Sequence, residues 1–166
     1  FSKQLKLRGK QQDSIENFSD KINKVSKSKL HEEFMVIARI ESLILDAGID
    51  DALKRAFNYV EAGADGIMIH SRKSTPKEIF IFSKEFREKY STIPLICVPT
   101  SYNTVYEYEL IDNGFNVVIY ANQLLRAAYP AMYKTAESIL LNKRAFEADK
   151  DLMSIKEILK LIPGTT

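Results

Sequence analysis

The sequence predicts an α/β protein assembled from parallel β/α units. Four short apolar runs, each with polar residues at its end, occupy residues 34–42, 66–71, 95–100 and 117–122. Segments with helical spacing separate these runs, so a new strand begins roughly every 20–30 residues, the rhythm of repeated β/α units. The runs are continuous rather than alternating, which is typical of strands covered on both faces. Four such units can form an open doubly wound sheet or half of an eight-stranded barrel of about 250 residues.

Helices are predicted before the first strand and between the strands. Over residues 13–26 the apolar side chains recur on one helical face, and Asp13 or Ser14 is placed to cap the helix. Residues 50–65 show the same periodicity and form the next predicted helix, which ends at Gly63. The basic, aperiodic segment before residue 11 is predicted to be a loop.

Two further helices are expected between the remaining strands. The helix over residues 75–90 begins with Thr75 before Pro76, a typical cap followed by a first-turn proline. The helix over residues 104–114 ends at Gly114. We expect the four strands to lie parallel, adjacent and in chain order, at residues 34–40, 66–70, 95–99 and 117–121.

The last part of the sequence is predicted to be helical and to close the domain. Residues 124–142 form a long helical pattern in which Pro130 marks a kink or a helix start. After a polar link, residues 154–162 form a last helix that Ser154 is placed to cap.

The composition indicates one soluble domain with a sizeable core. The chain has 166 residues, of which 45% are hydrophobic and 28% charged, and a net charge of +2, which argues against a general nucleic-acid binder. No apolar run approaches the roughly 20 residues of a membrane span. Cys97 is the only cysteine and lies in an apolar run, so we expect a core residue and a cytoplasmic protein. Because the chain opens on Phe1, we expect it to be a piece of a longer protein.

Polar residues at the strand ends are the candidate functional residues, because parallel β/α folds place their chemistry at the carboxyl ends of the strands. Arg39 and Glu41 are two residues apart and therefore point to the same side of a strand. A convergent set of Arg, His and Asn side chains suits an anionic, oxygen-rich ligand. The four pairs are Arg39 and Glu41, His70 and Ser71, Thr100 and Ser101, and Asn122 and Gln123.

Structural roles for the same residues remain open at this point. Arg39 and Glu41 can form an ion pair that closes one end of a core, and His70 can be a hydrogen-bonded core histidine. Thr100 and Asn122 can each be turn or cap residues. The sequence has no glycine-rich phosphate-binding motif, and neither of its two histidines has a nearby partner of metal-binding type.

Four segments carry a family resemblance. The stretches "VIARIES", "DALKRAFNYVEAGADGIMIHS", "LICVPTSY" and "VVIYANQLLRAAYPAM" resemble the phosphoenolpyruvate mutase and phosphonopyruvate hydrolase group of the isocitrate lyase superfamily, from Phe1 to about Leu161. The resemblance implies strands five to eight of a TIM-type (β/α)8 barrel. It divides the chain into a gating-loop-like segment at 1–12, a half-barrel with closing helices at 13–162, and the start of a linker at 163–166.

The resemblance also implies a reaction, the interconversion of phosphoenolpyruvate and phosphonopyruvate in phosphonate biosynthesis. It implies Mg²⁺ at the barrel mouth, with ligands expected in the missing amino-terminal half, so that this chain alone would be inactive and would supply no metal ligand. The catalytic residues would be Arg39, Lys3 and His70, the last donating a hydrogen bond in its imidazolium form. Ser71 and Asn122 would also contact substrate. Residues behind them would support the site: Glu41, Thr100 and Gln123.

Two departures from the family pattern leave alternatives open. Leu5 and Lys6 stand where the gating loop of mutases has Asn and Ser. The family's "WANHxLRA" is altered here at Tyr120 and Gln123. Alternatives are therefore a phosphonopyruvate hydrolase, a carbon–carbon lyase of the superfamily, and a non-catalytic half-barrel assembly module. The expected partners are a small anionic substrate, the missing half and further copies of the chain, with neither nucleic acid nor membrane among them.

Overall fold

The structure is a computed structural model that describes residues 12–162 and residue 164. The chain divides into two compact units, residues 1–121 and residues 122–166. Residues 1–11 of the gating-loop-like segment, with Lys3, Leu5 and Lys6, and most of the predicted linker lie outside the described residues.

The first unit contains a four-stranded parallel sheet in the order β1-β2-β3-β4. The strands are β1 Ile37–Ile40, β2 Gly66–Ile69, β3 Leu95–Cys97 and β4 Val117–Val118. The predicted direction, adjacency and order are therefore confirmed. The strands are shorter than predicted: β1 begins at Ile37 because Phe34 and Met35 are exposed and lie before the paired segment. β4 is shortest, although the Ile119 N–H still donates to the Cys97 carbonyl oxygen (2.9 Å).

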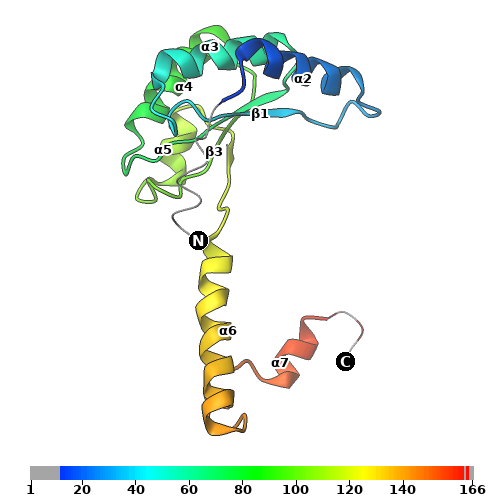
Figure 1. Cartoon of the computed structure of the whole chain (residues 1–166), viewed down its shortest axis with the longest axis vertical. Coiled ribbons are helices and arrows are strands. Elements are labelled where there is room, and N and C mark those ends of the chain that lie inside the picture. The colour runs from blue at the N-terminus through cyan, green and yellow to red at the C-terminus, as the bar shows by residue number, and fades with distance from the viewer. Residues whose placement is uncertain (1–11, 163, 165–166) are drawn as a thin grey trace. The chain divides into compact units, whose positions relative to one another are not determined.

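Helices α2, α3 and α4 lie on one side of the sheet (Figure 1). The helices of this unit are α2 Ile15–Lys27, α3 Gly48–Glu61, α4 Lys77–Lys89 and α5 Glu107–Asp112. The Ser14 hydroxyl accepts the Asn17 N–H (3.1 Å), which confirms Ser14 as the cap of α2. Helix α3 ends as predicted beside Gly63, whose φ of +102° disfavours other residues, and a Cβ there would lie 2.8 Å from the Ser26 hydroxyl.

The predicted cap of α4 is wrong. The helix begins at Lys77, so the cap position falls on Pro76 itself, which has no side-chain hydrogen bond to offer. The Pro76 carbonyl accepts the Phe80 N–H (3.0 Å) and starts the helix one residue later than the sequence predicted. Thr75 therefore lies outside the cap position.

The core lies between the sheet and its helices. Alternate strand residues enter it: Ala38, Ile40, Ile67, Ile69, Leu95 and Cys97 are all buried there. Phe86 of α4 is fully buried and its ring stacks on Phe82 and Phe57, with centroid distances of 5.8 and 6.1 Å. Burial raises the pKa of the Cys97 thiol to about 12, so this thiol is a core group and not a nucleophile, as predicted.

The second unit contains α6 Gln123–Asn142, the 3-10 helix η1 Asp149–Asp151 and α7 Ile155–Lys160. Pro130 lies inside α6, so the alternative that it starts a helix is wrong. The Ser154 hydroxyl accepts the Glu157 N–H (3.2 Å), which confirms the predicted cap of α7. Neither helix contains a buried residue. Within the described part of the chain, no helix combines the length and the hydropathy that a membrane crossing requires.

Candidate active site

Arg39 and His70 lie on the same face of the sheet, at the carboxyl ends of two adjacent strands. Arg39 of β1 pairs with Met68 of β2, two residues before His70. The residues that flank them, Ile40 and Ile69, are buried in the core on the helix side. Because side chains alternate along a strand, Arg39 and His70 point away from the helices. The structure thus brings together the two residues that the sequence singled out first.

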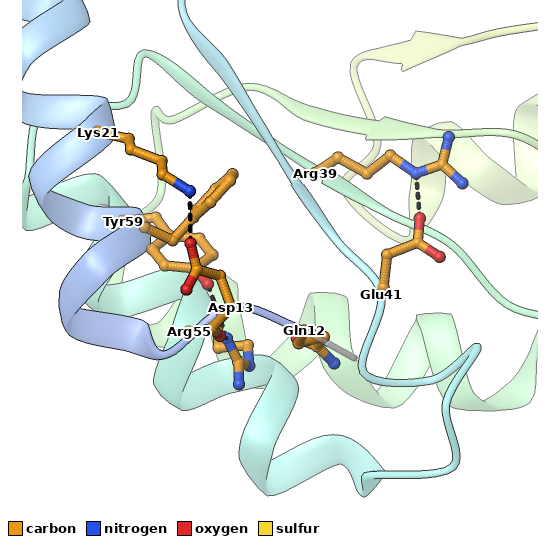
Figure 2. A pocket seen from close by; sticks show the side chains of 8 residues that line it. Gln12, Asp13, Lys21, Arg39, Glu41, Arg55 and Tyr59 are labelled. Carbon is orange, nitrogen blue, oxygen red and sulfur yellow. Dashed lines mark hydrogen bonds and ion pairs between the residues drawn. The ribbon is translucent and has the colours of Figure 1, made fainter. Parts of the chain in front are cut away.

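Arg39 and Glu41 form an ion pair in which the Arg39 Nε donates to a Glu41 carboxylate oxygen (Figure 2). The Arg39 side chain is 53% exposed, and only its Nε–H is used in a hydrogen bond among the described residues. Its terminal N–H groups remain available for a ligand. Glu41 therefore holds the guanidinium in one orientation while leaving its outer edge open, as a support residue would.

The surroundings of His70 favour its neutral form. Burial lowers the pKa of the His70 imidazole below its ordinary value, and the charges of Arg39 and Arg72 lower it further, against an opposing effect of Glu41. The buried Nδ1 atom has no hydrogen-bond partner among the described residues. A ligand can thus meet an unsatisfied imidazole nitrogen, and the imidazolium form considered from the sequence is disfavoured here.

We expect the His70 imidazole to titrate below pH 6.5, its ordinary value. A proton NMR titration, with the resonance assigned by its loss in His70→Gln, measures this midpoint. The stability contribution of the neutral group is complete above the unfolded pKa and falls as the pH drops towards the folded pKa. In Arg39→Gln the midpoint should rise, because a positive charge is lost and Glu41 is left unpaired. An unchanged midpoint would contradict the proximity of Arg39 and His70.

Arg72 is a further basic residue after the carboxyl end of β2, and the sequence analysis did not identify it. Ser71 is fully buried, donates to a Glu78 carboxylate oxygen and accepts the Lys73 N–H (3.0 Å). Ser71 is turned to the helix side, and Arg72, which is exposed, follows it in the loop after β2. The effect of the Arg72 charge on the pKa of His70 agrees with this placement. The i, i+2 spacing of His70 and Arg72 is the signal that could have revealed Arg72.

The remaining predicted residues differ in their surroundings. The hydroxyl of Ser71 forms its hydrogen bonds to Glu78 and Lys73 within the chain. The Thr100 N–H donates to the Val98 carbonyl oxygen (2.8 Å) in the turn after β3. Asn122 and Gln123 begin the second unit, where the Asn122 N–H donates to the Gln123 side chain (3.1 Å). Asn122 Oδ1 is buried without a partner among the described residues.

A pocket of about 210 Å³ lies beside β1, between Arg39–Glu41 and helices α2 and α3. Figure 2 shows the Arg39–Glu41 pair on one side and Lys21, Asp13, Arg55 and Tyr59 on the other. The pocket is lined by Gln12, Asp13, Phe18, Lys21, Arg39, Glu41, Arg55 and Tyr59. Within the described ranges, no group of three or more His, Cys, Asp or Glu residues is placed to hold a metal ion.

A family model described as phosphoenolpyruvate phosphomutase matches residues 2–140. The chain belongs to the phosphoenolpyruvate phosphomutase family. A curated relative, the phosphonopyruvate hydrolase of Variovorax sp. (strain Pal2), is 39% identical to it over 148 residues, which are 89% of this chain and 50% of the relative. The chain spans about half the length of the curated relatives it matches.

Solved structures of this family share the fold. The phosphoenolpyruvate phosphomutase of Streptomyces platensis subsp. rosaceus matches with a TM-score of 0.84 and 32% identity over 92% of this chain and 52% of that one. A phosphonopyruvate hydrolase solved as a complex with oxalate and Mg²⁺ matches with a TM-score of 0.81 and 37% identity over 93% and 55%. The four parallel units are therefore half of the TIM-type barrel of the phosphoenolpyruvate phosphomutase family, as predicted.

Proposed function

We propose that the full-length protein interconverts phosphoenolpyruvate and phosphonopyruvate. The observation that carries this proposal is the group of Arg39, His70 and Arg72 at adjacent strand ends, in a chain of the phosphoenolpyruvate phosphomutase family. Both compounds carry a carboxylate and a phosphorus oxyanion, and guanidinium groups bind such oxyanions in a fixed, directed geometry. Hydrolysis of phosphonopyruvate is the second candidate, which the 39% identical hydrolase favours.

In this proposal the residues of the chain position and neutralise a migrating phosphoryl group. A phosphoryl group in transfer is loose and highly charged, so positioning and charge stabilisation supply most of the catalysis. Arg39 grips two of its oxygens and is oriented by Glu41. The neutral imidazole of His70 donates one hydrogen bond. Thr100, in the turn after β3, supports the site.

The segment at 1–12, with Lys3, is proposed to close over the substrate and exclude water. Water that reached the phosphoryl group would turn the mutase reaction into hydrolysis. The identity of this segment therefore separates the two candidate reactions. Leu5 and Lys6 replace the Asn and Ser of mutases. Substitutions at these two positions test whether the segment selects the mutase or the hydrolase reaction.

Mg²⁺ is the proposed cofactor, and the relative bound to oxalate and Mg²⁺ supports it. The described residues offer no cluster of metal-binding side chains, so we assign the ligands to the remainder of the full-length protein. Bound there, the ion would stabilise the negative charge of an enolate oxygen.

Incubation of the full-length protein with phosphonopyruvate and Mg²⁺, followed by phosphorus NMR, tests the proposed function. A mutase gives phosphoenolpyruvate, and a hydrolase gives inorganic phosphate. The separately expressed chain, which lacks the proposed metal site, is the inactive control. If the full-length protein leaves phosphonopyruvate unchanged, both candidate reactions are excluded and a lyase or an assembly role is favoured.

Arg72 is proposed to attract the anionic substrate to the strand ends. Unlike Arg39, it forms no ion pair among the described residues, so its charge is not neutralised locally. We expect Arg72→Gln to lower kcat/KM about tenfold at low salt, with a smaller loss at high salt because salt screens the attraction. Lys84→Gln, on the outer side of α4 beside Ile81, is the matched control. An Arg72→Gln effect independent of salt would contradict a steering role.

The second unit is proposed to pack against further copies of the chain or against the missing half. Its helices expose large apolar side chains such as Leu124, Leu140 and Ile155, and the turn between α6 and η1 exposes Phe146. The outer edges of β1 and β4 also lack a paired strand among the described residues. We expect light scattering of this chain to give a mass of at least twice 19.0 kDa, and a monomer at high concentration would oppose the proposal.

We also propose that the protein acts in the cytoplasm.

A further inference from the structure

Ser42, Asp51 and Arg55 form a hydrogen-bonded network directly behind the proposed substrate site. The fully buried Ser42 hydroxyl donates to Asp51 Oδ2 (2.7 Å), and Arg55 Nε donates to the same oxygen (2.9 Å). Arg55 lies in α3, where its side chain is only 12% exposed, and its Nη1 also donates to the Tyr59 hydroxyl (2.9 Å). The guanidinium is thus held by several acceptors at once.

This network joins two segments that are far apart in the sequence. Arg55 Nη1 donates to the Asp13 carbonyl oxygen (2.9 Å), and the Gln12 amide donates to the Ser42 hydroxyl (3.3 Å). Gln12 and Asp13 are the first residues that the structure describes and directly precede Ser14, the cap of α2. At the other end, Ser42 directly follows Glu41, the partner of Arg39.

The turn that carries Glu41 depends on the same hydrogen-bonded network of Ser42, Asp51 and Arg55. The Glu41 carbonyl accepts the Ile44 N–H (2.9 Å), and the Ser42 carbonyl accepts the Ala47 N–H (2.8 Å). The buried Ser42 side chain fixes this turn against α3 through Asp51. Arg55 and Gln12 line the same pocket as the Arg39–Glu41 pair and lie lower in the view of Figure 2.

We propose that Arg55 is a positioning residue of the substrate site. It holds the Asp13 carbonyl directly, and it holds the Glu41–Ser42 turn through Asp51, so that residues 12–13 and the Arg39–Glu41 pair keep a fixed relation. Arg55 itself has no part in contacting the substrate. The proposal rests on the proposed function, because the fixed relation matters for the reaction only if Arg39 binds the substrate.

The test compares Arg55→Ala, Arg55→Lys and Ser42→Ala with wild type in the full-length protein. We expect Arg55→Ala to lower kcat at least tenfold with less than a threefold change in KM. Misplaced side chains weaken the stabilisation of the transition state more than they weaken the binding of the substrate. Arg55→Lys should recover part of kcat, since an ammonium can still reach one acceptor. Ser42→Ala, which keeps Arg55 bound to Asp13 and Asp51, should give an intermediate loss. Asn58→Ala, on the same helix, is the control, because the Asn58 side chain donates to the Lys54 carbonyl (2.8 Å) and takes no part in the network.

Hydrogen exchange provides a readout that does not depend on activity. In Arg55→Ala the amides of Ile44 and Ala47 should exchange at least tenfold faster, while the amide of Phe80 at the start of α4 should not change. Unchanged exchange, or a kcat per folded molecule equal to wild type, would overturn the proposal and leave Arg55 a purely structural residue. If wild type converts neither phosphonopyruvate nor phosphoenolpyruvate, the proposed function fails, and the exchange measurement alone decides whether the network fixes the turn.

Discussion

Arg39→Lys in the full-length protein should reduce the rate of phosphonopyruvate conversion by a factor of about a hundred to several thousand. Lysine keeps the charge but loses the two-pronged guanidinium. Loss of one charged, directed contact in a dry site costs on the order of 3–5 kcal/mol of transition-state binding. Steady-state kinetics with phosphorus NMR identification of the product measures the effect. The same protein preparation should be melted in parallel.

Folding should change little in the same variant. The Arg39 side chain is about half exposed, and exposed ion pairs contribute about 0–1 kcal/mol to stability. Arg144→Lys is the matched control, because Arg144 also pairs with a glutamate, Glu147, through an exposed side chain in the second unit. If Arg39 were only a structural ion-pair partner, the melting temperature would fall and turnover per folded molecule would stay constant. Unchanged turnover in stably folded Arg39→Lys would remove Arg39 from the site.

Phe86→Ala should lower the free energy of unfolding by about 3–5 kcal/mol, the range for removal of a buried phenyl ring. Phe86 is fully buried in α4 and lies within 6.1 Å of each of three aromatic rings, those of Phe57, Phe82 and Tyr90. The cavity left behind would therefore be lined by rigid rings that cannot collapse into it. Urea unfolding followed by circular dichroism measures the loss.

Ile81→Ala in the same helix is the control for the Phe86 variant. The Ile81 side chain is 48% exposed, so its truncation should change the free energy of unfolding by less than about 1 kcal/mol. Equal losses in the two variants would mean that α4 is packed differently from the structure described above. Phe86→Ala should also leave kcat per folded molecule unchanged, because Phe86 lies on the helix side of the sheet.

The order and direction of the strands were predictable because their apolar runs are continuous and are separated by helix-length segments. The pairing of Arg39 with Glu41 followed from their i, i+2 spacing in the sequence. The four quoted stretches of sequence also indicated the family, and the family model that matches residues 2–140 confirms it. These features are local or periodic, so a single sequence contains them.

Features that depend on contacts between distant residues were not predictable. Ser71 looked like a ligand contact, but its hydroxyl meets Glu78 across the loop before α4. The start of α4 shifted past Thr75 because the Pro76 carbonyl, and not a threonine side chain, begins the hydrogen-bonding pattern. The contact of Arg55 with the Asp13 carbonyl joins residues 42 positions apart, and no periodicity in the sequence signals it.

The alternation of the strands has a consequence for how this protein can evolve. Ile40 and Ile69 carry the packing on the helix side, whereas Arg39 and His70 lie outside the core cluster on the opposite face. Selection acts on the two faces almost independently, since a substitution at a strand end disturbs few of the contacts that keep the fold. Side chains at the strand ends can thus change while the packing on the helix side, and with it the stability of the fold, is kept. The phosphoenolpyruvate phosphomutase and the phosphonopyruvate hydrolase to which this chain is similar share one scaffold in this way.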